Sequence, residues 1–270
     1  MVIELNRDFG TQWSVLVKDI DSGAELFSAD PQTVLATASI GKLFLLHRLL
    51  HEVDAGTRKL EETVTRQPFE QIDDSGLWYL MQQNTLSLYD VAVLIGAFSD
   101  NAATNTLTRV LGIETVREHA SSLGYKHSRL NDVVRWPRPV HKPQQLSVGN
   151  AEELVRFVTR LANAEDLSES SSDILQRWLG AGADLSMVAQ PFNLDPLAHY
   201  AYDRDIWFWN KTGTIGSARA DVGLVMNRER RVAYAAIAQW QTDTENRDAV
   251  LANMAEIGEL IGQHLGFKQN

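Results

Sequence analysis

The sequence contains no cysteine among its 270 residues. It therefore has no disulfide framework, no thiolate nucleophile and no cysteine-ligated metal. Any covalent chemistry that the protein performs must use an oxygen or a nitrogen nucleophile. Positive charge is also scarce, because 25 Lys and Arg face 35 Asp and Glu and leave a formal net charge of −10. This balance disfavours nucleic acid as a partner, since general binding to phosphates needs a basic surface.

Long apolar runs are missing as well. No segment approaches eighteen consecutive apolar residues, so we expect no transmembrane helix. The first residues, MVIELNRD, contain no basic region, apolar run or small-residue cleavage site. As the sequence stands this predicts a cytoplasmic location, or a periplasmic or secreted one if a leader has been trimmed. The 44% of hydrophobic residues are enough to bury a substantial core.

The hydrophobic pattern predicts strands near both ends of the chain and helices between them. Residues 12–20 alternate and form a predicted hairpin with 24–27. Three further strands are expected at 206–214, 218–226 and 232–240. Helices are expected over 39–56, 86–98, 102–111, 115–123, 151–162, 168–178 and 247–265.

Two local features refine this pattern. Ser147 is expected to cap the helix that begins at Ala151. The proline-rich run 136–145 is expected to form a surface loop. The order of elements predicts an α+β fold, with a sheet lobe made from residues 1–36 and 203–270 and an inserted all-α lobe made from 37–202. An active-site groove would lie between the two lobes.

Ser39 and Lys42 lie one helical turn apart at the start of a strongly apolar segment. Burial of that segment would draw Lys42 into the core, and desolvation would then favour its neutral amine, which is a base. At the first turn, the amide of Ser39 would help to hold an oxyanion. Ser-x-x-Lys should nevertheless occur about once by chance in a chain of this length. The Ser-x-x-Lys motif therefore indicates a catalytic site only if other motifs accompany it.

Two further motifs follow, Ser99-Asp100-Asn101 and Lys211-Thr212-Gly213. Each alone has an ordinary explanation, because the first can cap a helix and the second can end a strand. With the Ser39 motif, in this order, they resemble the set found in class A β-lactamases and penicillin-binding proteins. The resemblance implies the β-lactamase and transpeptidase-like fold, an antiparallel sheet flanked by helices with an inserted helical lobe.

The chemistry of these residues fits that resemblance. Ser39 is the candidate nucleophile, and Lys42 accepts its proton directly or through water. Ser99 can pass a proton to the leaving nitrogen, and Asn101 can hydrogen-bond a substrate amide. These four residues would form one side of the groove.

A predicted strand supplies the opposite side. Lys211 and Thr212 are expected to bind a substrate carboxylate, and Gly213 to allow a close approach of the backbone. The amides of Thr214 and Ser39 would form the oxyanion hole.

Three more side chains near this strand have two explanations each. The segment Arg219-Ala220-Asp221-Val222 is similar to a family segment whose arginine binds the substrate carboxylate, so we assign that role to Arg219. The alternative for Arg219 is a solvated surface charge. Trp207 and Trp209 alternate toward Lys211 and either line the groove or pack within the sheet.

The resemblance fails at one place. Class A β-lactamases have an Arg-Trp-Glu-Pro-like segment whose glutamate activates the deacylating water, whereas this chain reads RWPRPVH from Arg135 to His141. Pro137 stands where the glutamate is expected and cannot accept a proton. His141 can replace it as the base, although a lone loop histidine is more often a surface residue. Acylation is therefore better supported than hydrolysis.

Three functions follow from these observations. The first is a class A β-lactamase-like serine hydrolase that forms an acyl-enzyme with β-lactams or a related amide or ester, with impaired deacylation. The second is a penicillin-binding or D-alanyl-D-alanine peptidase-like protein, and the third is a non-catalytic binding module on the same fold. The expected partner is a small-molecule substrate, with no metal or organic cofactor, and a monomer is the favoured state.

Overall fold

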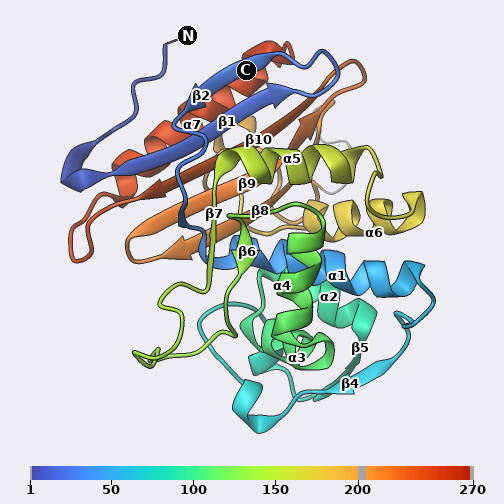
Figure 1. The fold of residues 1–270 in the computed structure, drawn as a ribbon. Coiled ribbons are helices and arrows are strands. Elements are labelled where there is room, and N and C mark those ends of the chain that lie inside the picture. The colour runs from blue at the N-terminus through green and yellow to red at the C-terminus, as the bar shows by residue number, and fades with distance from the viewer. Residues whose placement is uncertain (1, 200–204, 268–270) are drawn as a thin grey trace.

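The computed structural model describes residues 2–199 and 205–267. A five-stranded antiparallel sheet forms one side of the molecule, in the order β2-β1-β10-β9-β8 (Figure 1). Its strands are β1 (Gln12–Asp19), β2 (Glu25–Ala29), β8 (Trp207–Ile215), β9 (Ala218–Met226) and β10 (Arg231–Gln239). The expected hairpin and the three later strands are confirmed. Because β1 pairs with β10, the sheet joins the two ends of the described chain.

Strand β10 is covered on both faces, and its residues alternate between two hydrophobic clusters. Ala233, Ala235 and Ile237 belong to the cluster that contains α5 (Ala151–Ala162). Their neighbours Val232, Tyr234, Ala236 and Ala238 belong to the cluster that contains α7 (Arg247–His264). This is the two-residue period of a strand.

The remaining helices lie on the α5 side of the sheet (Figure 1). They are α1 (Lys42–Asp54), α2 (Leu88–Phe98), α3 (Asn101–Leu111), α4 (Ile113–Ser122) and α6 (Glu169–Gly180). All seven expected helices are present, with ends that differ by up to three residues. The expected boundary between 202 and 203 lies outside the described residues. Among the described helices, none is long and apolar enough to cross a membrane.

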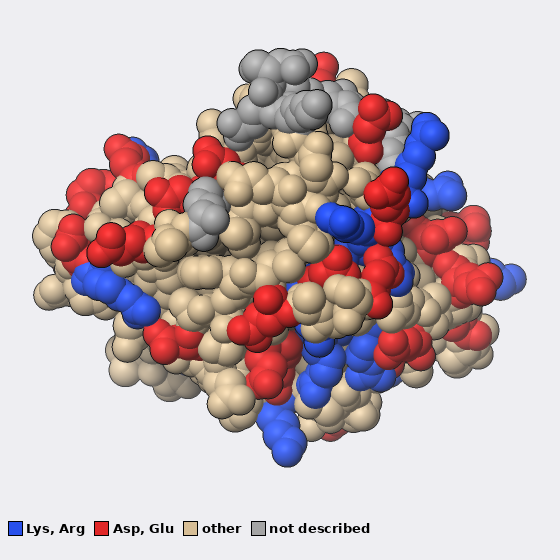
Figure 2. Space-filling view, turned by 90° about the horizontal axis from the view of Figure 1, so that it is seen from above, with Lys and Arg blue, Asp and Glu red and all other residues tan. Residues whose placement is uncertain are grey.

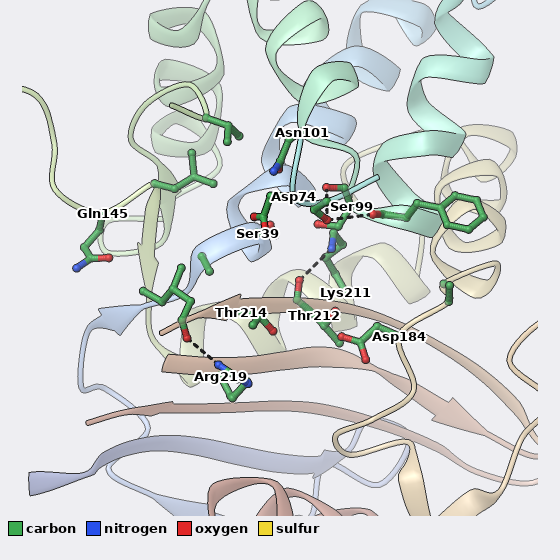
Figure 3. A pocket seen from close by; sticks show the side chains of 18 of the residues that line it. Ser39, Asp74, Ser99, Asn101, Gln145, Asp184, Lys211, Thr212, Thr214 and Arg219 are labelled. Carbon is green, nitrogen blue, oxygen red and sulfur yellow. Dashed lines mark hydrogen bonds between the residues drawn. The ribbon is translucent and has the colours of Figure 1, made fainter. Parts of the chain in front are cut away.

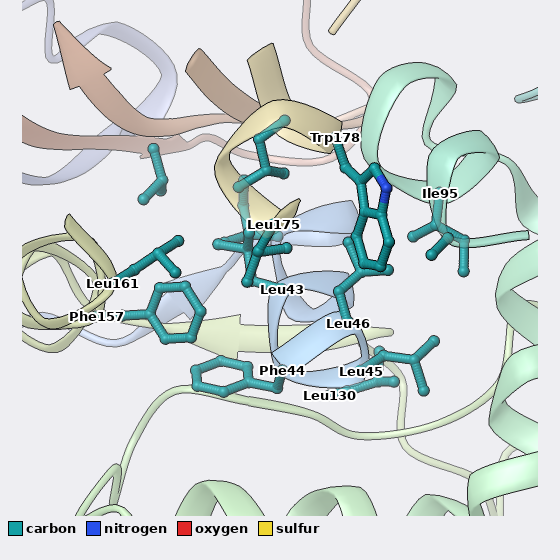
Figure 4. Packing of buried hydrophobic residues seen from close by; sticks show 14 of the residues in the cluster. Leu43, Phe44, Leu45, Leu46, Ile95, Leu130, Phe157, Leu161, Leu175 and Trp178 are labelled. Carbon is teal, nitrogen blue, oxygen red and sulfur yellow. The ribbon is translucent and has the colours of Figure 1, made fainter. Parts of the chain in front are cut away.

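Helix α1 lies at the centre of the larger cluster (Figure 4). Its residues Leu43 to Leu46 are at most 1% exposed and pack among α2, α5 and α6. Burial of each large apolar side chain contributes about 1.5–3 kcal/mol before the entropy cost of folding. The helix that carries Lys42 is therefore held rigidly from several sides.

Short elements complete the described fold. Two small sheets contain β3 (Leu35–Ala36), β7 (Ser147–Gly149) and β6 (Arg129–Leu130), and β4 (Thr63–Thr65) with β5 (Thr85–Ser87). The 3₁₀ helices are η1 (Asp8–Gly10), η2 (Ala38–Gly41), η3 (Pro68–Glu70), η4 (Trp78–Leu80) and η5 (Gln190–Phe192). Among the described residues on the face seen in Figure 2, acidic and basic side chains are interspersed.

Two sequence expectations were wrong in detail. Ser39 lies in the 3₁₀ turn η2, and the α-helix begins only at Lys42. Ser147 lies in β7, whereas the cap of α5 is Asn150, whose side chain accepts a hydrogen bond from the Glu153 amide at 2.9 Å. Ser147 is instead used by η2, because its hydroxyl donates to the Ala38 carbonyl at 2.6 Å.

Candidate active site

A cavity of ≈1080 Å³ lies between the edge strand β8 and the turn that joins α2 to α3 (Figure 3). Seven of the predicted site residues line it: Ser39, Ser99, Asn101, Lys211, Thr212, Thr214 and Arg219. The other two, Lys42 and Gly213, lie directly behind these residues and contact them or their backbone. The structure thus brings all nine predicted positions together.

The turn η2 presents Ser39 to the cavity. Ala38 has the uncommon φ of 47°, and the Gly41 amide donates to Ser147 Oγ at 3.2 Å. These contacts satisfy polar groups that a short turn leaves unpaired. Ser39 itself is partly exposed, which leaves its hydroxyl accessible from the cavity.

Strand β8 approaches η2 so closely that only glycine fits between them. A Cβ on Gly213 would lie 2.2 Å from the Thr37 carbonyl oxygen and 3.1 Å from the Ser39 nitrogen. The next residue, Thr214, lines the cavity on the same strand. This packing provides the close backbone approach expected of Gly213, and it places the strand beside the Ser39 amide.

Lys42 is completely buried. Its amine donates hydrogen bonds to the Ser99 carbonyl, to Ser99 Oγ at 3.2 Å and to Asn101 Oδ1 at 2.9 Å. Burial lowers the pKa of Lys42 well below its usual range, and the positive charge of Lys211 lowers it further. The charges of Asp100 and Asp74 oppose this shift in pKa. Lys42 is therefore suited to lose its proton and act as a base, as the sequence predicts.

The Ser99-Asp100-Asn101 motif both caps a helix and lines the cavity. Asp100 is the N-cap of α3, and its Oδ1 accepts from the Ala103 amide at 2.8 Å. Ser99 ends α2 with the left-handed φ of 53°, and it lines the cavity together with Asn101. The ordinary explanation of the motif is thus correct for Asp100, while its two neighbours face the cavity.

Lys211 extends from β8 and is only 2% exposed. Burial lowers the pKa of its amine to about 8, although the charges of Asp184 and Asp221 act in the opposite direction. Its amine donates to the Thr212 carbonyl at 2.9 Å. At neutral pH Lys211 is largely protonated and supplies positive charge to the wall of the cavity.

Asp221, on the neighbouring strand β9, forms hydrogen bonds that hold strand β8 in place. It is fully buried, and burial raises its pKa to about 7, as does the charge of Asp184. It accepts hydrogen bonds from Asn210 Nδ2 and the Tyr234 hydroxyl, both at 3.0 Å, and from the Val188 amide at 3.0 Å. These bonds hold the residue that precedes Lys211.

Arg219 is a second cation in the cavity wall. Its guanidinium donates to the Ile215 carbonyl at 2.7 Å and to the Ala218 carbonyl at 2.9 Å, and it lies 5.7 Å from the centre of the Trp240 ring. It is therefore held in place by the β8–β9 turn. Trp209 is completely buried and Trp207 packs against the same cluster, so these tryptophans serve sheet packing.

Comparisons with known proteins show the family of the chain and the proteins that share its fold. A family model described as the beta-lactamase enzyme family matches residues 2–265. The chain belongs to this family. Among the described residues, no group of three His, Cys, Asp or Glu side chains is arranged to hold a metal ion. No curated protein sequence matches the chain significantly.

Solved structures of low sequence identity share the fold. The β-lactamase from Sphaerobacter thermophilus DSM 20745 is 20% identical, with a TM-score of 0.83 over 97% of this chain and 94% of that one. An ancestral class A β-lactamase is 20% identical, with a TM-score of 0.79 over 96% of both chains. PBP-A is 19% identical, with a TM-score of 0.79 over 95% of this chain and 90% of that one. The fold is therefore the β-lactamase/transpeptidase-like α+β fold that the motifs imply.

The loop that follows β6 carries the segment from Arg135 to His141. Trp136 and Arg138 line the cavity from this loop. Pro137 and His141 are exposed and do not belong to the cavity lining. The Asp132 carboxylate forms ion pairs with Arg135 at 2.8 Å and with Arg138 at 3.2 Å. The catalytic role considered for His141 thus has no support from its position.

Sequence reasoning missed three charged residues of the cavity: Asp74, Arg138 and Asp184. Arg138 lies in the run from Arg135 to His141, where the sequence draws attention to Pro137 and His141 instead. Asp74 and Asp184 belong to no motif, and they reach the cavity through contacts with residues far from them in the sequence. Asp184 lies beside Thr212 and Lys211, whereas Asp74 lies on the side of Ser99 (Figure 3).

Proposed function

We propose that the protein is a serine β-lactamase-like hydrolase that forms an acyl-enzyme at Ser39. The observation that carries this proposal is the buried amine of Lys42, which is bonded to Ser99 and Asn101 and has a strongly lowered pKa. A neutral amine at this place can take the Ser39 proton directly or through water while the hydroxyl oxygen attacks a substrate carbonyl.

The residues around Ser39 and Lys42 would carry the next two steps, stabilisation of the oxyanion and protonation of the leaving nitrogen. The amides of Ser39 and Thr214 stabilise the oxyanion of the tetrahedral intermediate. The protonated Lys42 returns the proton through the Ser99 hydroxyl to the departing nitrogen, so that the amide C–N bond breaks and the acyl group stays on Ser39. This route is supported by the hydrogen bond between Lys42 Nζ and Ser99 Oγ.

We further propose that release of the acyl group is slow. None of the residues with which this loop lines the cavity is a base at neutral pH; they are Val134, Trp136, Arg138, Gln144, Gln145 and Leu146. A positioned general base contributes about 100- to 10,000-fold to such a step. The same observation favours the second candidate, a penicillin-binding or D-alanyl-D-alanine peptidase-like protein that β-lactams inactivate.

Intact-mass spectrometry of the protein mixed with benzylpenicillin tests both parts. The mass should rise by one ligand and return only slowly, and Ser39→Ala should abolish the rise. Ser22→Ala, an exposed serine in the β1–β2 turn, is the matched control and should still be acylated. With a chromogenic cephalosporin, a burst of about one equivalent should precede slow turnover.

Each alternative has its own outcome. Rapid steady-state hydrolysis without a detectable adduct would contradict slow release. An adduct in Ser39→Ala would place the nucleophile elsewhere. Reversible binding without any adduct would favour the binding module.

A further inference from the structure

Charged side chains line the cavity on both the strand side and the opposite side, next to Ser99. Lys211 and Arg219 line the strand side, where Asp184 also lies, beside Thr212 (Figure 3). The Asp184 carboxylate already accepts hydrogen bonds from the Ser186 amide at 3.2 Å and from the Ser186 hydroxyl at 2.7 Å. Its charge also acts on both cations. The carboxylate of Asp74 lines the opposite side, next to Ser99.

The Ser99-Asp100-Asn101 motif holds the segment that follows Asp74. The Ser75 carbonyl accepts from the Asn101 amide at 3.0 Å, and Ser75 Oγ donates to the Ser99 carbonyl at 3.3 Å. Two residues later, the Leu77 amide donates to Asp100 Oδ2 at 2.6 Å. This part of the chain is therefore fixed relative to the candidate catalytic residues.

Gly76 shows how tightly the segment packs. A Cβ at this position would lie 2.3 Å from Asp100 Cγ, and its φ is 107°. Asp74 itself adopts the uncommon φ of 86°. The segment thus approaches the motif as closely as a glycine allows, and it leaves Asp74 at the edge of the cavity.

The Asp74 carboxylate is available to a ligand. Over residues 2–199 and 205–267 it makes no hydrogen bond or ion pair, and it is exposed. Its charge acts on Lys42 without a direct contact. Arg138, a cation of the loop side, is already paired with Asp132. An anion that faces the cavity in this way attracts a positively charged group on a bound molecule.

We propose that the cavity selects zwitterionic substrates, with a carboxylate held by Lys211 and Arg219 and an ammonium group on the acyl side held near Asp74. The cavity volume of ≈1080 Å³ is large enough for a ligand that reaches both sides. The inference rests on the proposed function, because Ser39 lines the same cavity and would attack the central amide or lactam carbonyl. It makes Asp74 a specificity-determining residue.

Two penicillins test this directly. Ampicillin differs from benzylpenicillin by one ammonium group on the acyl side chain and retains the carboxylate. We would measure the second-order rate constant of acylation for both and compare their ratio between variants, so that any general effect of Asp74 on Lys42 cancels. Asp74→Asn should lower the ratio of ampicillin to benzylpenicillin by roughly two- to five-fold, the effect of one exposed charge pair. An unchanged ratio would overturn the inference.

Asp73→Asn is the matched control. It removes the same charge from the neighbouring residue, which is exposed and outside the cavity lining, and it should keep the ratio of the parent protein. A loss of preference in Asp73→Asn as large as in Asp74→Asn would indicate a general effect of net charge and would also overturn the inference.

Non-covalent binding separates the inference from the proposed function. Ser39→Ala, titrated with each penicillin by calorimetry, should bind ampicillin more tightly, and adding Asp74→Asn should remove that preference. If no variant is acylated but this preference is present, the proposed function fails and the inference holds. If Ser39→Ala binds neither penicillin, or binds both equally, the inference fails whatever the acylation result.

Discussion

The Lys42 amine donates a hydrogen bond of 2.9 Å to Asn101 Oδ1, and both residues are buried. This bond joins the start of α1 to the start of α3. It holds the candidate base in place while burial lowers the pKa of Lys42. Burial of Lys42 therefore both fixes the position of the candidate base and favours its neutral form.

The first prediction concerns the pH dependence of acylation. Only neutral Lys42 can accept a proton, so the acylation rate should rise with pH and level off well below the usual lysine pKa. Lys42→Arg stays protonated and should acylate about 100- to 10,000-fold more slowly, without this rise. Stopped-flow measurements between pH 5 and 10 would show this, and a variant as fast as the parent would rule Lys42 out as the base.

A second pH effect should appear on the alkaline side. The pKa of Lys211 is lowered to about 8 by burial, so the positive charge that is proposed to bind the substrate carboxylate is lost above that pH. The apparent affinity for carboxylate-bearing ligands should then fall as the pH rises past about 8. Lys211→Arg should move this loss to higher pH, and an unchanged profile would argue against the role of Lys211.

The third prediction concerns the close approach at Gly213. An alanine there would place a Cβ 2.2 Å from the Thr37 carbonyl oxygen, so β8 must move away from η2. Gly213→Ala should destabilise the fold by about 1–3 kcal/mol and slow acylation by about 100-fold or more, as loss of an oxyanion donor does. Gly216→Ala is the control, because its Cβ would meet nothing within 4 Å. Equal effects in the two variants would contradict the explanation.

The fourth prediction concerns Arg219, which is held by the Ile215 and Ala218 carbonyls at the cavity wall. Removal of a charged hydrogen-bond donor costs about 1.5–3 kcal/mol, so Arg219→Ala should slow acylation by carboxylate-bearing ligands by roughly 10- to 100-fold. Arg228→Ala removes an exposed arginine beyond the other end of β9 and should have little effect. If Arg219→Ala acylated as fast as the parent, another cation would have to bind the carboxylate.

The fifth prediction concerns stability in acid. His47 Nδ1 lies 2.9 Å from His119 Nε2, and burial lowers the pKa of His47 to about 3 and that of His119 to about 4. Between these values and the usual 6.5 the unfolded chain binds more protons than the native one. The free energy of unfolding should therefore fall as the pH falls from 6.5, by up to about 2 kcal/mol per histidine at pH 5.

Denaturant titrations at pH 7 and pH 5 would measure this loss. His47→Gln should weaken the dependence of the unfolding free energy on pH, because one titrating group is removed. His127→Gln, which changes an exposed histidine, should retain the full dependence. A parent protein equally stable at both pH values would contradict the assignment.

Much of the fold can be read from local pattern. Alternation over residues 232–238 predicts a strand, and the two faces of β10 do enter different clusters. The apolar run after Lys42 predicts a buried helix, and this is confirmed. Such periodicities are visible because each residue's environment depends on neighbours two to four positions away. The motifs likewise indicate the family and the candidate site, because within one fold the same residue types occur in the same order along the chain.

Other features were decided only by the tertiary structure. Ser147 resembles a helix cap in the sequence, but in the structure it stabilises the turn that carries Ser39. Its hydroxyl donates to the Ala38 carbonyl, 109 positions earlier in the chain, because β7 packs against η2. Asp74 enters the cavity because Asp100 and Asn101 hold the segment after it.

The same holds for Pro137, which is exposed and outside the cavity lining, whereas Arg138 lines the cavity. The sequence by itself determined the elements, the burial of Lys42 and the set of candidate residues, because these depend on short-range periodicity and on residue type. The tertiary structure decided which other charges share the cavity. That choice depends on packing between segments far apart in the chain, and no local pattern encodes it.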